Sequence, residues 1–462
     1  MNIEELKGIA TMALEMGEKQ NPDEIEVYLG HQTQTNVNIQ NGRISGSEHS
    51  VDVGLGIRIA FPGKKVGTAF TTNLAKDAIK KTILNVSRTA KKSAVDEEWL
   101  GLPTKSGTPP KEKYYFSHLH DIPIEEIAKV AADLIKGCTV EGIKDPIIPI
   151  LGNSLLAFSN VVTMNSHGIE AVDQASFFVV LIAALAIKEG KPGPYNFDYF
   201  VSRDKVLDDP IGFANEIAKE AYNLANAKKV KLPEKVPVVF HPYGLSSLAQ
   251  FIFLPSIRAD VKQQGNSILA DRLGEQIVPG DFDMYDDGTL PGCISSSLYD
   301  AEGIAKHRTP IFEKGIFRSF IYDHTTAQKD ALESTGNAQR SDETGVNPGE
   351  YANVPKVSTS NWVVKPGTVD LENLISDIKL GVLVKNVQGA HQGSPESGEY
   401  TGVINPGWVI RNGEISEPVV GLGLGGQILE LFNNFEGATS STKTLISAHL
   451  PHVRFSQMRI VS

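Results

Sequence analysis

Alternation of apolar and polar side chains near the N-terminus constrains the fold of this sequence most. It runs through EIEVYLG (24–30), TNVNIQNGRIS (35–45) and VDVGLGIRIAF (51–61). Because successive side chains of a strand point to opposite faces, this period predicts strands. Asn-Gly at 41–42 and Pro-Gly at 62–63 are turn dipeptides between strands. The sequence therefore predicts an antiparallel meander.

Helical spacing of apolar residues appears on both sides of this meander. Asn73 is a candidate helix N-cap, and Gly137 is suited to end a helix. The predicted helices cover residues 3–20, 73–91, 122–137 and 208–229.

Three further strands are predicted at 146–160, 161–174 and 176–190. The last of these contains the longest apolar run, FFVVLIAALAI (177–187), which suits a buried strand or a turn of core helix. The predicted fold class is α+β, with a mainly antiparallel N-terminal sheet and flanking helices.

The charged, proline-containing stretch KKVKLPEK (228–235) predicts a domain boundary. We expect an N-terminal α+β domain over residues 1–230 and a second domain over 231–462. Frequent Gly, Asn, Asp and Pro turn signals predict that the second domain is β-rich. Short helices are expected at 370–379 and 425–437.

Charge and composition exclude several classes of partner. The net charge of -11 disfavours direct binding to nucleic acid or to an anionic membrane, and KKVK (228–231) is the only short basic run. Two distant cysteines make no disulfide framework or zinc spacing, which favours a reducing cytoplasm. The N-terminus lacks the pattern of a signal peptide, and the longest apolar run is too short to span a bilayer.

The residues alone supply no complete catalytic set. No HExxH or HExxxH string occurs, and GLGLGGQ (421–427) matches a dinucleotide-binding pattern without the βαβ frame that this pattern needs. Two histidine pairs remain as candidate metal ligands: His118 with His120, and His449 with His452.

The second half resembles the TldD/PmbA family. The resemblance rests on an ordered series of segments: GNSILADRLGEQI (265–277), DDGTLPGCISSSLYDAEGIAKHRTPIFEKGIFRSFIYDHTTAQKD (286–330), STGNAQR (334–340) and GEYTGVINPGWVIRNGEI (398–415). The first half is similar in layout, with an initial helix, a meander and an Asn-Ser-x-Gly segment at Asn165, Ser166 and Gly168.

That family has a zinc-binding arm, TldD, with a His-Glu-x-x-x-His helix, and an arm without this motif, PmbA or TldE. Counting back from Ser267, the family's two histidines and glutamate fall on Gln250, Pro255 and Phe251, and a later acidic position falls near Arg258. No cysteine follows Cys293, so the C-terminal thiolate of the zinc arm is also missing. Asp260, Ser267, Gly274 and Glu275 match the family frame around these positions.

The resemblance implies the PmbA/TldE-like arm. It implies a non-catalytic partner of a TldD-type zinc metallopeptidase, which forms a heterodimer and shapes a channel for unfolded or precursor peptides. It also implies the family's description as modulators of DNA gyrase. We expect no cofactor in this chain, with zinc in the partner subunit. Asp260, Asn337 and Arg340 are the candidate substrate-binding residues, since an arginine there can pair with a carboxylate.

Two alternatives stay open. The chain is a metallopeptidase in its own right, with His118 and His120 or His449 and His452 as ligands. Otherwise it is a stand-alone peptide-binding protein, or a homodimer when the partner is absent.

Overall fold

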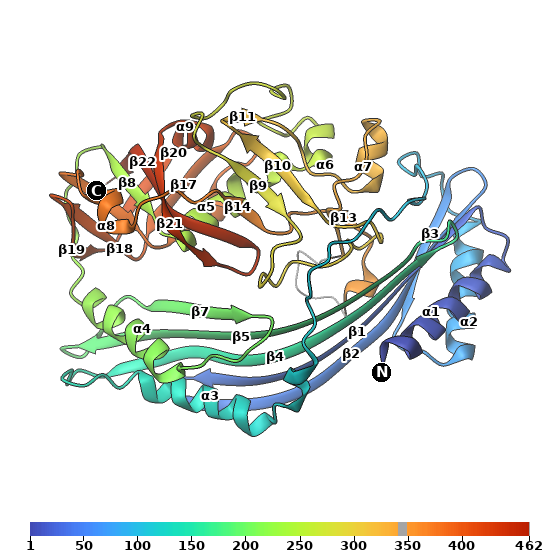
Figure 1. Cartoon of the computed structure of the whole chain (residues 1–462), viewed down its shortest axis with the longest axis horizontal. Coiled ribbons are helices and arrows are strands. Elements are labelled where there is room, and N and C mark those ends of the chain that lie inside the picture. The colour runs from blue at the N-terminus through green and yellow to red at the C-terminus, as the bar shows by residue number, and fades with distance from the viewer. Residues whose placement is uncertain (341–348, 462) are drawn as a thin grey trace.

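The computed structural model describes residues 1–340 and 349–461, and in this part the chain forms two sheets that face each other (Figure 1). The first is seven-stranded, in the order β3-β2-β1-β4-β5-β6 with β7 also on β5, and the second is thirteen-stranded. A small third sheet pairs β12 with β13.

The elements of the first half are α1 (Ile3–Glu18), β1 (Glu24–Gln40), β2 (Arg43–Phe61), β3 (Lys65–Thr71), α2 (Lys76–Ala90), the 3-10 helix η1 (Ser117–Asp121), α3 (Ile124–Gly137), β4 (Ile147–Asn165), β5 (Glu170–Lys188), β6 (Lys191–Pro192), β7 (Asn196–Ser202) and α4 (Pro210–Leu224).

The elements of the second half are β8 (Lys235–Phe240), α5 (Pro242–Ile252), η2 (Leu254–Ile257), α6 (Ala259–Gln263), β9 (Met284–Asp287), β10 (Arg308–Glu313), β11 (Ile316–Phe317), α7 (His324–Lys329), β12 (Ala338–Gln339), η3 (Glu350–Ala352), β13 (Lys356–Val357), β14 (Trp362–Val364), α8 (Leu371–Ile375), β15 (Leu380–Val384), β16 (Val387–Gln388), η4 (Ala390–Gln392), β17 (Glu399–Ile404), β18 (Gly407–Arg411), β19 (Glu414–Val419), β20 (Leu422–Gln427), α9 (Ile428–Asn433), β21 (Phe435–Thr444) and β22 (Ala448–Val461).

This architecture confirms the α+β class and corrects the number of strands near the N-terminus. Residues 24–40 form one strand rather than two, because the polar stretch near Gln32 is paired on both sides, with Asp52 of β2 and Ser159 of β4. The expected turn after β1 is present, with positive φ at Asn41 and Gly42.

The strands predicted at 146–160 and 161–174 are also corrected. β4 continues through Asn160 to Asn165, and a single hairpin connects it to β5. The Asn165 side chain makes this turn by accepting the backbone N–H groups of His167 and Ile169 at 2.9 and 3.2 Å. Gly168 there has a φ of +87°, which favours glycine.

The helix ends differ slightly from the sequence prediction. α2 begins after Ala75, which is its N-cap residue. Asn73 lies two residues before this position, and its side chain accepts the N–H of Ala75 at 3.0 Å. α4 begins where Asp209 accepts the N–H of Gly212, and it ends at Leu224 rather than 229. Such end effects depend on local hydrogen bonds that periodicity does not reveal.

The four α-helices of the first half cover one face of its sheet. α1 and α2 pack on one end through residues such as Leu6 and Ile83, and α3 and α4 pack on the other through Leu134 and Ala218. Along β1, Ile25, Val27 and Leu29 point to this helical face. The alternate residues Glu26 and Tyr28 therefore point to the opposite face, called here the inner face, which the second half covers.

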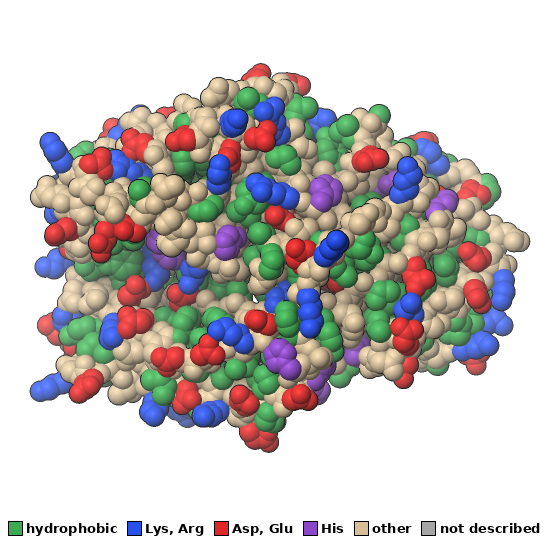
Figure 2. Space-filling model, in the orientation of Figure 1, with side chains coloured by type: hydrophobic (Ala, Val, Ile, Leu, Met, Phe, Trp, Pro, Cys, Tyr) green, Lys and Arg blue, Asp and Glu red, His purple; other side chains and the backbone are tan. Residues whose placement is uncertain are grey.

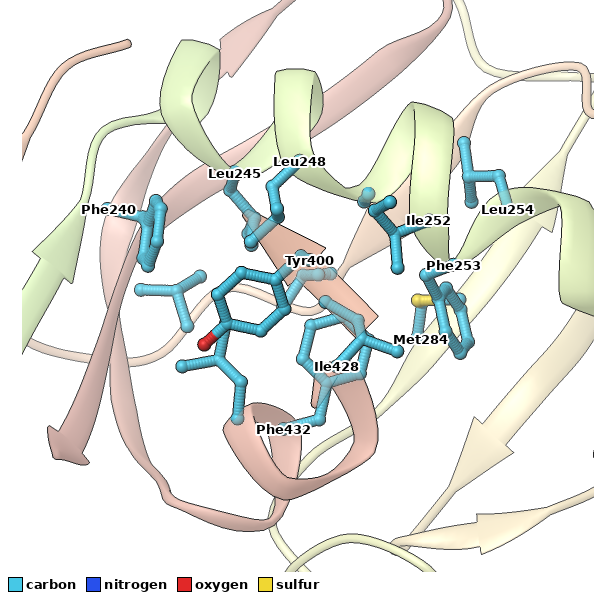
Figure 3. Packing of buried hydrophobic residues seen from close by; sticks show 14 of the residues in the cluster. Phe240, Leu245, Leu248, Ile252, Phe253, Leu254, Met284, Tyr400, Ile428 and Phe432 are labelled. Atoms are coloured by element: carbon cyan, nitrogen blue, oxygen red, sulfur yellow. The ribbon is translucent and has the colours of Figure 1, made fainter. Parts of the chain in front are cut away.

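The core of the second half surrounds α5. Leu245, Leu248, Ala249 and Ile252 lie on one stripe of this helix and are buried against Tyr400, Ile428 and Phe432 (Figure 3). The apolar spacing i, i+3, i+4, i+7 produces that stripe. GLGLGGQ is mostly the strand β20, and the predicted short helices are α8 and α9.

The boundary at residues 230/231 stays a prediction, although the change from one sheet to the other falls between β7 and β8. Within residues 1–340 and 349–461, none of the helices has the length and apolar character that crossing a bilayer requires.

Two glycines of β2, Gly54 and Gly56, lie against Tyr351 and let the second half dock on the first. A Cβ on Gly56 would lie 2.2 Å from the carbonyl oxygen of Tyr351, whereas a Cβ on Gly46 of the same strand would meet nothing within 4 Å. We predict that Gly56→Ala lowers the free energy of unfolding by about 1–3 kcal/mol, since overpacking displaces the backbone of η3. Gly46→Ala is the matched control. Urea unfolding measures both, and equal stabilities would contradict this packing.

Candidate functional site

The inner face meets the second half around a cavity of about 330 Å³, called here the interface cavity. Figure 2 shows a furrow between the two halves on the face in view. Strand register places Val161 of β4 beside Asp173 of β5, and Thr163 beside Tyr28 of β1. The polar residues that line the interface cavity include Tyr28, Gln32, Ser159, Asp173, Arg203 and Lys306.

A buried ion network joins the halves beside this cavity. Glu26, 1% exposed, accepts hydrogen bonds from Arg58 of β2 at 2.9 Å and from Arg340 of the second half. Arg58 also donates to Glu302 at 3.3 Å. Burial acts to raise the pKa of Glu26, but the two guanidinium groups outweigh it and the pKa is lowered. Burial raises the pKa of Glu302.

Arg203 makes a second link between the halves. It follows β7 and is 2% exposed. Its guanidinium donates to the backbone carbonyls of Cys293, Ile294 and Ser296, the last at 2.5 Å. The planar group thus holds one loop of the second half against the inner face.

Asp173 lies beside Arg203 and holds the same loop from below. Its Oδ2 accepts the N–H groups of Leu298 and Tyr299 at 2.8 and 3.3 Å. Its Oδ1 is buried and has no hydrogen-bond partner in the described part of the chain. Burial raises the pKa of this carboxyl to about 6, although Arg203 and Lys306 act in the opposite direction.

The structure brings two of the three predicted substrate-binding residues to this interface. Arg340 lines the cavity, but its donors go to Glu26 and to the carbonyls of Ala301 and Asn353. Asn337 is 1% exposed and donates to Asp286 at 2.7 Å. Both side chains therefore have internal partners, and substrate binding by them remains a prediction.

Asp260, the third predicted residue, lies elsewhere. It is the second residue of α6 and pairs with Arg258 at 2.6 Å. It lines a separate surface hollow with Glu97, Glu98 and Lys329. The structure thus separates Asp260 from the interface cavity, and its role in binding also stays a prediction.

The positions that correspond to the zinc motif lie on and just after α5. Gln250 and Phe251 are on the outer side of this helix, opposite its buried stripe, and Phe251 is 42% exposed beside the His391 ring. Pro255 lies in η2, and Arg258 faces Asp260. These side chains do not fit a zinc ion, since phenylalanine and proline offer no ligand and an arginine repels the cation.

The alternative histidine pairs have other partners. His118 Nε2 lies 2.7 Å from the carbonyl oxygen of Asp204, and the His120 ring stacks on Phe158 at 3.6 Å. His449 lies between Thr442 and Thr444, at 2.8 and 3.0 Å. Across the part of the chain that the structure describes, no group of three or more His, Cys, Asp or Glu residues is placed to hold a metal ion.

His452 lies instead against a histidine from α5's N-terminal cap. Its ring and that of His241 are 4.9 Å apart and perpendicular. Burial lowers the pKa of His452 to about 4, with Lys443 and Lys385 adding to this effect. The pair is therefore neutral near pH 7.

Comparisons with known proteins agree on one family. A model described as the PmbA/TldA metallopeptidase C-terminal domain matches residues 233–462, and one described as PmbA/TldA metallopeptidase domain 1 matches residues 25–90. The metalloprotease PmbA homologue of Haemophilus influenzae is 27% identical over 443 residues, which cover 93% of this chain and 90% of that protein.

Two solved structures share the fold. TldE from Thermococcus kodakarensis superposes with a TM-score of 0.90 at 23% identity, over 98% of this chain and 100% of that one. A Thermotoga maritima protein, described as a candidate modulator of a DNA gyrase, gives 0.85 at 20% identity over the same shares. The fold is thus that of metallopeptidase-related proteins with two facing sheets. The chain belongs to the PmbA/TldD family and is PmbA/TldE-like.

Sequence reasoning missed most of the interface residues. Glu26, Arg58, Asp173 and Arg203 are far apart in sequence and match no motif. Their one signal is a charged residue at an alternate position of an otherwise apolar strand. In EIEVYLG, Glu26 lies between Ile25 and Val27 and could equally be a solvent-exposed residue of the strand. Only the facing arginines show that this charge is buried.

We predict that Arg340→Ala destabilises the protein by about 3 kcal/mol or more, because it removes one of the two cations that neutralise buried Glu26. Arg411→Ala, which breaks an exposed pair with Glu417, is the control and is expected to cost less than about 1 kcal/mol. Urea unfolding distinguishes them. An Arg340→Ala protein of wild-type stability that fails to bind peptides would instead favour the substrate role.

We also predict that His452 weakens the protein in acid. An unfolded histidine binds a proton near pH 6.5, whereas His452 in the folded chain does so only near 4, so stability falls as pH drops from about 6.5. Between pH 7.5 and 5 the wild type is expected to lose about 2 kcal/mol more than His452→Gln. His49→Gln, at an exposed histidine, is the control. Equal slopes for all three would contradict the burial argument.

Proposed function

We propose that this chain is the non-catalytic partner subunit of a TldD-type zinc metallopeptidase, and that it shapes the path of unfolded or precursor peptides to the partner's zinc. This proposal rests on one observation: α5 is present and packed in the core, but the zinc-ligand positions on and after it hold other residues. The helix keeps its buried stripe and its place in the fold, while Gln250, Phe251 and Pro255 occupy the positions of the family's ligands and base.

The chemistry of hydrolysis supports this division of labour. A catalytic zinc needs about three protein ligands, an open position for water and a base that accepts the proton of that water. The side chains of Phe251 and Pro255 supply none of these, and Arg258 is already paired with Asp260. The proposal accordingly assigns no cofactor to this chain and zinc to the partner subunit.

The surface of α5 also suits contact with another chain. Phe251 exposes 42% of its area on the side where a catalytic relative would present its metal. An aromatic side chain on a surface is the kind of residue that interfaces bury. The proposal places the complex in the cytoplasm, as the two unpaired cysteines suggest.

A role as a modulator of DNA gyrase would follow from peptide processing. The net charge of -11 disfavours direct binding of DNA, whose phosphates attract basic proteins. We therefore propose an indirect effect, through the stability of other proteins.

We predict that the untagged chain, purified alone, contains far less than one zinc per chain and does not hydrolyse an unfolded substrate such as β-casein. Mixed with a TldD-type subunit from the same source, it is expected to form a complex in gel filtration whose peptidase activity is abolished by a chelator. The same run shows whether the chain alone is a homodimer.

His118→Ala and His452→Ala are the control variants, and both are expected to leave the activity of the complex unchanged. Chelator-sensitive hydrolysis by the chain alone, lost in either variant, would instead establish a metallopeptidase with its own ligand set. Peptide binding by the chain without any complex would favour a stand-alone binding protein.

A further inference from the structure

The interface cavity is enclosed by two surfaces of different origin. Its floor consists of alternate residues of β1, β4 and β5, and its roof is the loop over residues 294–301 with Lys306 and residues 338–340. At about 330 Å³ it is far larger than one water molecule, whose share of liquid volume is about 30 Å³. The space is therefore sufficient for a small organic ligand or the end of a peptide.

Most charged groups around this cavity are already satisfied. Arg203 donates to backbone carbonyls and Arg340 to Glu26, as described above. Lys306 donates to Ser360 at 2.6 Å and lies in the field of Asp286 and Asp300. Asp300 accepts the backbone N–H groups of residues 302, 304 and 338. Each of these groups therefore has a hydrogen-bond partner within the protein.

Asp173 is the exception. Asp173 is one of the residues that line the cavity. Two backbone N–H groups bind its Oδ2, while its Oδ1 is buried and has no donor from the described residues. A buried carboxylate oxygen without a hydrogen bond is costly, and such atoms in native proteins call for an explanation. A ligand that donates hydrogen bonds there would remove this cost.

We propose that the interface cavity binds a primary ammonium group, from the amino terminus of a peptide or from a lysine side chain, with Asp173 as its counter-ion. An ammonium group carries three hydrogen-bond donors and a positive charge, which is opposite to the charge of the carboxylate. Serines 159, 295 and 297 and Gln32 line the same space and can accept its other hydrogen atoms. Arg203, Lys306 and Arg340 also line the cavity, but each already donates to a group of the protein, whereas Asp173 has an oxygen without a donor from the described residues.

Binding at this place would also explain why two sheets meet around an open, polar space. A bound ammonium would bridge Asp173 of the first half and the loop of the second. The inference concerns this chain alone and holds whether or not a zinc-bearing partner exists, so its outcome is separate from that of the proposed function.

Calorimetry on the full-length chain at pH 7 tests this inference with three peptides. Trialanine amide carries a free amino terminus, N-acetyl-Ala-Lys-Ala amide carries only a lysine ammonium, and N-acetyl-trialanine amide carries neither. We expect at least one ammonium peptide to bind about tenfold or more tightly than the neutral one, and the two arms identify which source the cavity accepts.

Asp173→Asn is expected to reduce this affinity about tenfold or more, since asparagine keeps an acceptor for the loop but loses the charge. Asp271→Asn, at an exposed aspartate outside the cavity, is the matched control. Equal affinity for the acetylated peptide, no binding of either ammonium peptide, or wild-type affinity in Asp173→Asn would each overturn the proposal. The peptide comparison uses wild-type protein, so it does not depend on the folding of a variant.

Discussion

The docking of the two halves depends on the burial of Glu26 between two arginines. A lone carboxylate inside a protein is strongly disfavoured, so Glu26 can lie on the inner face only when Arg58 and Arg340 are both in place. Arg58 comes from the same sheet, while Arg340 comes from the opposite half. The first half is therefore stable only when the second half is docked so that Arg340 reaches Glu26.

This constraint explains why the interface is polar and still well packed. Glycines at 54 and 56 leave room on β2 for Tyr351, and Arg203 fixes the facing loop through its carbonyls. Between these contacts a cavity of about 330 Å³ remains. One carboxylate oxygen of Asp173, a residue that lines this cavity, receives no hydrogen bond from the described residues.

The helix α5 shows how a fold can persist without the chemistry that relatives perform on it. Its buried stripe of Leu245, Leu248 and Ile252 is needed for the core of the second half. The outer positions of α5 do not pack in this core, so Gln250 and Phe251 can differ from the residues of a catalytic relative without loss of the fold. Sequence reasoning located these positions by counting back from Ser267 in the family frame, which is a local pattern.

The sequence by itself determined the α+β class, the hairpin at Asn41-Gly42, most helices and the absence of a zinc motif, since each depends on residues near one another in the chain. It misplaced strand breaks at 31–34 and 160–161, because only pairing on both sides shows that a polar stretch continues a strand. The tertiary structure alone decided the partners of Glu26, Asp173 and Arg340. Those partners lie up to 314 residues away, where electrostatic pairing leaves no periodic signal in the sequence.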